Sequence, residues 1–340
     1  MRSNLNSAGQ LVLAAFMLAG VLTPATSGQE NYQYPSRVQI AWNRLSSYDE
    51  VLELCDRLVA AYPEMLSQEL IGQSFEGRKM VALTLNIEKT GPHHSKPALY
   101  IDGNIHGNEV QGTEVVLYTI WYLTKSYGKV EQLTELMDRC AFYFVPMVNP
   151  DGRAYWFDKP NSADSSRGGQ KPTDNDGDGL FDEDPPNDLD GDGLILRMRR
   201  EDPNGDYRES PEDYRLMVYV DPQQKGDFKR YTRLGSEGID DDGDGPVNED
   251  GPGGYDPNRN WPADWQPRYI QHGAGDYPLS LPENYSIAKF VLARPNIAAA
   301  QSYHNSGGMI LRGPGAEYTN YARADLRVYD KLAARGEQIL

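Results

Sequence analysis

Apolar side chains recur along the chain in two patterns, one with the period of a helix and one with the length of a buried strand. The stretches with helical periodicity are residues 48–62, 110–123, 285–293 and 321–340. The short apolar stretches typical of strands are residues 80–87, 97–101, 140–148 and 296–303. Because strands alternate with helices, we predict an α/β fold: a doubly wound, mixed and mostly parallel sheet with helices on both faces.

A long stretch without either pattern, at about residues 157–254, interrupts this alternation. An ordinary loop between two elements of a compact domain is far shorter. We therefore interpret the stretch as an irregular insertion into the α/β domain, and we expect it to need an ordering device of its own.

Acidic residues are concentrated in two parts of this insertion. The net charge of the chain is −17, and residues 174–192 and 237–250 together hold sixteen Asp or Glu and no Lys or Arg. The rest of the chain is therefore close to neutral. Nothing in it is basic enough to predict nucleic-acid binding.

Three copies of the pattern D-x-D-x-D-G lie within these acidic stretches. Carboxylates at alternate positions around a glycine turn bring oxygen ligands together on a hard cation. The twelfth position of an EF-hand loop needs a glutamate, but Pro185 and Arg199 stand there in the first two copies. The loops are more similar to the calcium loops of thrombospondin type 3 and dockerin modules. We expect Ca²⁺; a solvated acidic loop is the alternative. The expected ligands are Asp174, Asp176, Asp178, Asp188, Asp190, Asp192, Asp240, Asp242 and Asp244, with Asp182, Asp184, Asn248 and Asp250 as further candidates.

The N-terminal residues 1–27 have the composition of a secretory signal peptide, with Arg2, a short apolar stretch and small residues before the expected cleavage site. The apolar stretch is too short to span a bilayer; a buried N-terminal helix is the alternative. We expect a secreted or periplasmic protein, mature over residues 28–340, without a membrane span. An oxidising compartment would permit a disulfide between Cys55 and Cys140, and two buried free thiols are an equal alternative.

His106 and Glu109 lie between a predicted strand and a predicted helix, where α/β sheets present their chemistry. A His and a Glu three residues apart on such a turn can reach one zinc ion, and a catalytic zinc needs one more protein ligand. The pair alone is weak evidence, since a surface turn can have the same residues. Of the five histidines, only His106 and His304 follow strand-like stretches; we interpret His93 and His94 as exposed loop residues.

Four motifs, taken together, resemble those of the zinc carboxypeptidase family, the carboxypeptidase A/B-like metallopeptidases. They are H-G-N-E at residues 106–109, N-P-D-G at 149–152, D-P-N-R-N-W at 256–261 and S-Y-H-N at 302–305. They occur in the family's order, over about residues 48–330. The resemblance implies a hydrolase that uses Zn²⁺, bound by His106, Glu109 and His304, to cleave the C-terminal peptide bond of peptides or proteins with a free C-terminus.

The resemblance also implies roles for other residues. Asp256 matches the acid that hydrogen-bonds a zinc-ligating histidine, and such a carboxylate fixes the tautomer of the imidazole. Asn258 and Arg259 match the pair that receives the terminal carboxylate of a substrate, a task that suits the planar fork of arginine. For the arginine that polarises the scissile carbonyl, we favour Arg199 within residues 196–200.

The family's general base and its substrate-capping tyrosine have no match in this sequence. Glu317 and Glu337 fit the base neither by position nor by context. We therefore expect a catalytic domain without its C-terminal part, and a chain that by itself has little activity. Two alternatives stay open: an amidase of the same fold acting on cell-wall peptides or acyl-amino acids, and a catalytically dead, calcium-stabilised peptide-binding module.

Overall fold

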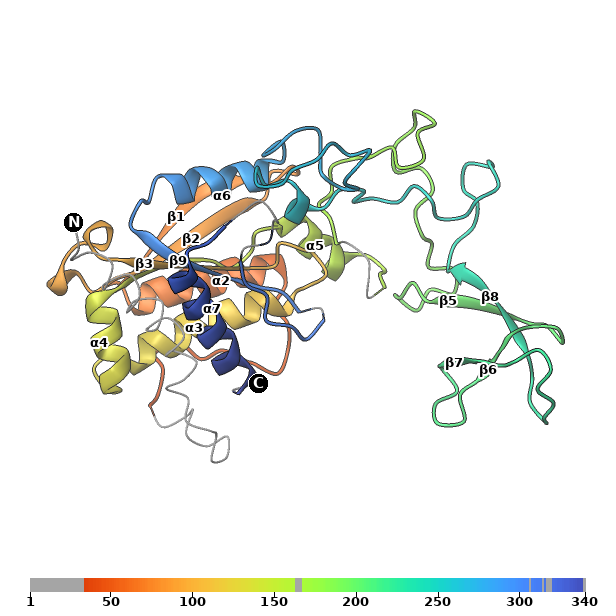
Figure 1. Cartoon of the computed structure of the whole chain (residues 1–340), viewed down its shortest axis with the longest axis horizontal. Coiled ribbons are helices and arrows are strands. Elements are labelled where there is room, and N and C mark those ends of the chain that lie inside the picture. The colour runs from red at the N-terminus through yellow and green to blue at the C-terminus, as the bar shows by residue number, and fades with distance from the viewer. Residues whose placement is uncertain (1–33, 163–166, 306, 314, 316–319, 339–340) are drawn as a thin grey trace. The chain divides into compact units, whose positions relative to one another are not determined.

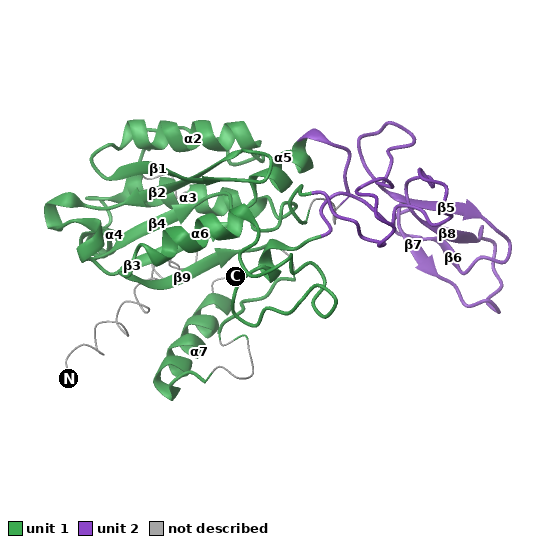
Figure 2. Cartoon of the chain, turned by 90° about the horizontal axis from the view of Figure 1, so that it is seen from above, with its two compact units in different colours: residues 1–157, 166–171, 255–340 green, residues 158–165, 172–254 purple. Residues whose placement is uncertain are grey.

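The computed structural model describes residues 34–162, 167–305, 307–313, 315 and 320–338. The expected signal peptide and Glu317 lie outside these residues. The chain forms two compact units (Figure 2). The first consists of Met1–Phe157, Ser166–Lys171 and Tyr255–Leu340, and the second of Asp158–Ser165 and Pro172–Gly254.

The first unit is built on a five-stranded mixed sheet. Its strands, in spatial order, are β1 (Leu66–Gln73), β2 (Lys79–Leu85), β4 (Ala141–Val145), β3 (Ala98–Gly103) and β9 (Ile297–Tyr303). β4, β3 and β9 are parallel to one another, whereas β1, β2 and β4 pair antiparallel. The predicted mixed α/β sheet is thus confirmed. The described strands are not mostly parallel, however, because two of their four pairings are antiparallel.

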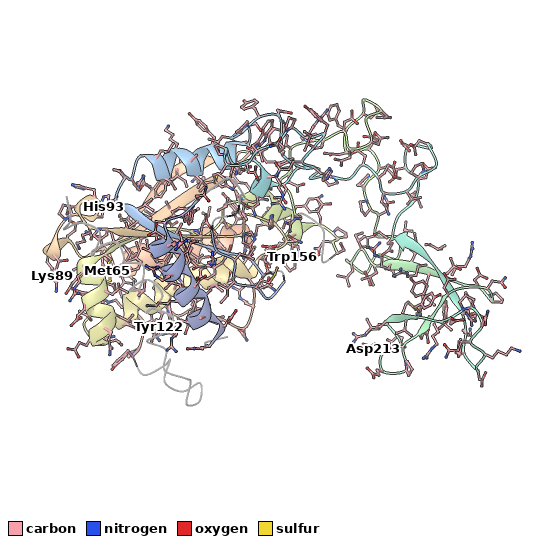
Figure 3. All side chains as sticks on the ribbon, viewed as in Figure 1. Met65, Lys89, His93, Tyr122, Trp156 and Asp213 are labelled. Atoms are coloured by element: carbon pink, nitrogen blue, oxygen red, sulfur yellow. The ribbon has the colours of Figure 1, made fainter. Side chains whose placement is uncertain are left out.

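Helices cover both faces of this sheet (Figure 1). The helices of the first unit are α2 (Tyr48–Ala61), α3 (Gln111–Ser126), α4 (Glu131–Arg139), α5 (Pro150–Asp158), α6 (Pro282–Leu292) and α7 (Arg323–Glu337). α2, α3 and α4 share one apolar core with the sheet, and α6 packs in a second core on the other face. Met65 and Tyr122, labelled in Figure 3, pack in the first core.

The alternation of side chains along β4 explains why both faces are covered. Phe142 and Phe144 belong to the core beneath α2 and α3, while Tyr143 belongs to the core beneath α6. All three are almost fully buried. A strand with large apolar side chains on both faces requires helices on both sides, because each face must leave water.

The second unit contains a four-stranded antiparallel sheet, which corrects the expectation of an irregular insertion. Its strands are β5 (Arg197–Glu201), β6 (Tyr207–Glu209), β7 (Met217–Tyr219) and β8 (Tyr231–Ser236), in the spatial order β5-β8-β6-β7. The strands are short and mostly half-buried or exposed. They therefore lack the continuous apolar stretches that mark the central strands of the first unit.

Cys55 and Cys140 are both free and buried in the first unit, the second of the two alternatives expected from sequence. Burial raises the pKa of the Cys55 thiol to about 12. A thiol that stays protonated is a poor nucleophile, so Cys55 acts as a small apolar side chain.

Among the described residues, none of the helices has both the length and the apolar character needed to cross a membrane.

Glu283, in the first turn of α6, is a buried acid with an incomplete set of hydrogen bonds. One carboxylate oxygen accepts from Phe75 N at 2.9 Å, and the other has no partner among the described residues. Burial raises the pKa of Glu283 to about 7. Because the pKa is higher in the folded state than in the unfolded state, this group stabilises the fold at acid pH and loses that contribution as pH rises through about 7.

We therefore expect Glu283→Gln to change the pH dependence of stability. The amide keeps the acceptor for Phe75 N and removes the buried charge, so the variant should gain up to about 3 kcal/mol over the wild type between about pH 4.5 and pH 8. Urea unfolding at several pH values measures this difference. Glu53→Gln, at an exposed position of α2, is the control. Parallel pH profiles for wild type and Glu283→Gln would contradict the assignment.

Candidate metal centre

The turn between β3 and α3 is fixed by a buried asparagine. Asn104 has a φ of 60°, a conformation that asparagine tolerates better than most residues. Its Nδ2 donates to the carbonyl oxygens of His106 at 2.7 Å and Gly107 at 3.1 Å. These bonds hold the backbone that carries His106 and Glu109 at the C-terminal end of β3.

The side chains of His106, Glu109 and His304 converge at this edge of the sheet. β3 and β9 are parallel neighbours in which Gly103 lies opposite Tyr303, so the residues that follow both strands meet. His304 Nδ1 lies 2.7 Å from Glu109 Oε2 and 3.2 Å from His106 Nδ1. His106 Nδ1 lies 3.1 Å from Glu109 Oε1. Two nitrogens and a carboxylate thus face one point.

This arrangement fits a zinc ion. Two donors that each lie 2.0–2.1 Å from zinc at a tetrahedral angle are about 3.3 Å apart, close to the separations among these three side chains. His106 and Glu109 are buried, while the His304 side chain is 33% exposed. The exposed side gives access to the position that a catalytic zinc leaves open for water or substrate.

The charges around His106 favour a bound cation. Burial alone would raise the pKa of Glu109, but hydrogen bonds to His106 and His304 hold it far below its ordinary value. Burial would likewise lower the pKa of His106, yet hydrogen bonds to Asp256 and Glu109 outweigh it and raise the pKa. The carboxylates of Glu109 and Asp256 are therefore both ionised, and they concentrate negative charge where a metal would bind.

Asp256 fixes the orientation of the His106 ring. Its Oδ1 lies 3.1 Å from His106 Nε2 and also accepts from Asn258 N at 2.7 Å, at the start of η4 (Pro257–Arg259). With Nε2 occupied by Asp256, His106 presents Nδ1 to Glu109 and His304. A carboxylate in this position makes the imidazole a better metal ligand.

Arg167 brings a guanidinium to the same group. It lies 3.0 Å from His106 Nε2, 3.3 Å from Asp256 Oδ2 and 3.5 Å from Glu109 Oε1, and its side chain is 44% exposed. Its backbone carbonyl accepts from Gly107 N at 3.1 Å, which attaches it to the turn that carries His106 and Glu109. This residue was missed from the sequence, because the arginine was expected within residues 196–200.

Comparison with known proteins assigns the family. The model of the zinc carboxypeptidase family matches residues 51–339. The chain belongs to the zinc carboxypeptidase family. Membership implies Zn²⁺ as the metal. In structure the chain resembles carboxypeptidase A from Helicoverpa armigera, with a TM-score of 0.50 and 19% identity, over 92% of this chain and 55% of that one. At this identity the likeness shows the fold, and it agrees with the mixed sheet.

Curated members of the zinc carboxypeptidase family match a shorter stretch. Over 126 residues, 37% of this chain, it is 33% identical to the inactive metallocarboxypeptidase ECM14 of Ajellomyces capsulatus, of which it covers 19%. Over 116 residues, 34% of this chain, it is 35% identical to carboxypeptidase B of Astacus astacus, of which it covers 36%. Over 129 residues, 38% of this chain, it is 33% identical to carboxypeptidase D of Rattus norvegicus, of which it covers 9%. The matches therefore span little more than a third of these relatives at most.

Arg199, the arginine favoured from sequence for a zinc carboxypeptidase site, has other partners. It lies on β5 in the second unit, where its guanidinium binds Glu209 at 2.8 Å and stacks over the Tyr231 ring at 4.7 Å. These contacts follow from the pairing of β5 with β8. Within the described part of the first unit, the guanidinium that contacts His106 and Glu109 is that of Arg167. The role expected for Arg199 stays a prediction, and Arg167 is a second candidate for it.

The other residues singled out in the sequence lie next to Asp256, before β3 or in the second unit. Asn258 and Arg259 form η4 immediately after Asp256, and Arg259 is exposed. His93, labelled in Figure 3, lies in η3 (His93–Ser95) before β3, whereas His106 follows β3. His93 is half-buried against Tyr143, which corrects its expected exposure. The acidic loops belong to the second unit and form four groups whose carboxylates could hold a metal, namely Asp174/Asp176/Asp250, Asp176/Asp178/Glu183, Asp188/Asp190/Asp192 and Asp240/Asp242/Asp244.

The N-P-D-G motif holds the segment that carries Arg167. Asn149 Nδ2 donates to Gly168 O at 2.8 Å, and Asn149 Oδ1 accepts from Gly152 N at 2.9 Å. A Cβ added at Gly152 would lie 2.7 Å from Gly168 O and 2.8 Å from Gly107 Cα. Gly152 is therefore needed where three segments approach one another.

We expect Gly152→Ala to destabilise the first unit by about 1–3 kcal/mol, because backbone atoms must move to admit the methyl group. Urea unfolding, followed by tryptophan fluorescence, measures this loss. Gly315→Ala, also in the first unit, is the control, since a Cβ there would meet nothing within 4 Å. An unfolding free energy equal to that of the wild type would argue against a tight contact at Gly152.

Proposed function

We propose that this protein is a zinc metallocarboxypeptidase that hydrolyses the C-terminal peptide bond of peptides or proteins. The observation that carries the proposal is the convergence of His106 Nδ1, a Glu109 carboxylate and His304 Nδ1 in a member of the zinc carboxypeptidase family. Zinc held by these donors supplies a Lewis acid and lowers the pKa of water toward neutrality. The residues around it bind and orient the substrate.

Arg167 is proposed as the residue that stabilises charge on the carbonyl oxygen of the bond to be cleaved. Its guanidinium lies beside the proposed ligands and is partly exposed, so its remaining N–H groups can reach a bound substrate. A fixed donor in this position is worth most when negative charge develops on the oxygen. Asp256 both orients His106 and holds Arg167 in place.

Asn258 and Arg259 are proposed to bind the terminal carboxylate of the substrate. Arg259 is exposed, and among the described residues it forms no ion pair. Its planar guanidinium can therefore donate two parallel hydrogen bonds to a carboxylate. Recognition of a free C-terminus would follow from this pairing.

A second candidate is a peptide-binding module that does not cleave what it binds. The observation in its favour is that one relative, 33% identical over 126 residues, is named an inactive metallocarboxypeptidase. Both candidates share the metal site and the carboxylate-binding residues, so they differ only in turnover. For either one we propose export from the cytoplasm, which rests on the composition of residues 1–27.

Calcium is the ion that we propose for the second unit. Its acidic loops provide carboxylate oxygens without imidazole or thiolate, a set that suits a hard cation and not zinc. The two units would thus bind different metals with different ligand chemistry.

We expect His304→Ala to retain less than about a tenth of the wild-type zinc after dialysis, because two protein ligands remain where a catalytic site needs three. Asp256→Asn, which keeps the shape and removes the charge beside His106, should weaken zinc binding about 10–100-fold. Zinc content by inductively coupled plasma mass spectrometry tests both variants. His94→Ala, at an exposed histidine, is the control. Full zinc occupancy in His304→Ala would refute the ligand set.

Peptides with free and amidated C-termini separate the remaining possibilities. The charge-assisted pair to Arg259 contributes about 1.5–3 kcal/mol, so amidation should weaken binding to the zinc-loaded protein roughly ten- to a hundredfold. Arg259→Met should bind both peptides equally. Calorimetry measures binding, and mass spectrometry detects release of the C-terminal residue. Release supports the peptidase. Binding without release agrees with both candidates, because the sequence has no match for the family's general base. Equal affinity of the wild type for both peptides contradicts the proposed role of Arg259.

A further inference from the structure

The beginning and the end of the second unit lie against each other. Asp184 and Asp250 form an isolated antiparallel bridge, in which Asp184 N donates to Asp250 O at 3.1 Å. Asn175 N donates to Asp250 Oδ2 at 3.2 Å, and Asn175 Nδ2 donates to Gly251 O at 3.1 Å. The first acidic loop is therefore attached to a segment about seventy-five positions later in the chain.

Asp250 is fully buried within this contact, and one of its oxygens is unsatisfied. Its Oδ2 has the bond from Asn175, but its Oδ1 has no hydrogen-bond partner among the described residues. A buried carboxylate without partners is costly, because the charge has left water and nothing replaces the lost solvation. A cation bound at Oδ1 would remove this cost.

The side chains needed for such a cation are present. Asp174, Asp176 and Asp250 each offer a carboxylate oxygen, and the three oxygens lie within 4.8 Å of one another. Asp176 also belongs to a neighbouring group with Asp178 and Glu183, which can complete a larger coordination shell. Ca²⁺ takes six to eight oxygen ligands in flexible geometry, whereas Mg²⁺ demands a near-ideal octahedron.

We infer that a calcium ion bound by Asp174, Asp176 and Asp250 joins the two ends of the second unit. The inference rests on the proposal that this unit binds calcium, and it adds where one ion sits and what it connects. Because the ion has ligands from both ends of the insertion, calcium would hold these two ends together and would do more than order a single loop.

The other two acidic loops do not share the feature that carries this inference. The fully or largely buried acids near them, Asp184 and Glu237, are satisfied by backbone N–H groups. Asp184 accepts from Asp241 N at 2.9 Å and from Asn248 N at 2.6 Å, and Glu237 accepts from Leu189 N at 2.8 Å. Neither acid is left to attract a cation. Both carboxylate oxygens of Glu249 are buried without a hydrogen-bond partner among the described residues, but Glu249 belongs to none of the four acid groups that could hold a metal. The inference is therefore confined to the loop beside Asp250.

The test is calorimetric titration of calcium into the full chain, freed of divalent cations on a chelating resin. Asp250→Asn and Asp176→Asn should each lose one bound ion or weaken its binding at least about tenfold, because each removes a charged ligand. Asp176 is exposed, so its variant folds even if Asp250→Asn does not. Asp227→Asn, at an exposed acid of the same unit outside the loops, should bind calcium like the wild type.

Hydrogen exchange gives an independent measurement. Calcium should slow amide exchange at residues 173–184 and 248–251 together in the wild type, and at neither segment in Asp176→Asn. If the wild type binds no calcium, the proposed ion of the second unit is wrong. The other contrary outcome is that calcium binds with equal stoichiometry and affinity to the wild type and to both variants, Asp250→Asn and Asp176→Asn. In that outcome the second unit binds calcium elsewhere, and the inferred ion between its two ends is wrong.

Discussion

The parallel pairing of β3 with β9 is the constraint on which the metal centre depends. His106 and His304 are 198 positions apart in the chain, yet their Nδ1 atoms lie 3.2 Å apart because each residue follows a strand of this pair. Parallel strands end at the same edge of a sheet, so the register of backbone hydrogen bonds sets the position of both rings. A slip of one residue between β3 and β9 would turn the side chains of the slipped strand to the opposite face and would separate the two rings.

Polar side chains buried beside this edge fix the positions of the residues that the paired strands bring together. Asn104 fixes the turn backbone, and Asp256 fixes the ring of His106. Arg153, fully buried, donates to Asn104 Oδ1 at 3.2 Å and to Val110 O at 2.9 Å, and forms an ion pair with Glu114 at 2.8 Å. Burial lowers the pKa of Arg153 to about 10, so it remains charged at neutral pH and this network stays intact.

The sequence predicted the elements whose pattern is local and missed those that depend on distant contacts. The helix at α3 and the strands at β3 and β9 were predicted because their periodicity and length are evident in the chain. β1 was missed because its half-exposed side chains follow no clear alternation. Arg167 was missed because its place is set by bonds from Gly107 and Asn149, which lie far from it in sequence. Similarly, nothing around Asp250 in the sequence indicates that its partner is Asn175.

The contact between Arg167 and Asp256 affects how easily the segment between them can change in evolution. The two residues belong to the first unit and flank the larger segment of the second, Pro172–Gly254, and their side chains lie 3.3 Å apart. The segment inserted between them therefore begins and ends at almost the same place. The free energy of closing a loop rises by only about 0.6 kcal/mol for each doubling of its length. A gene can therefore lengthen, shorten or exchange this segment with little effect on the folding energy of the first unit, and such freedom makes it a place where members of one family can diverge.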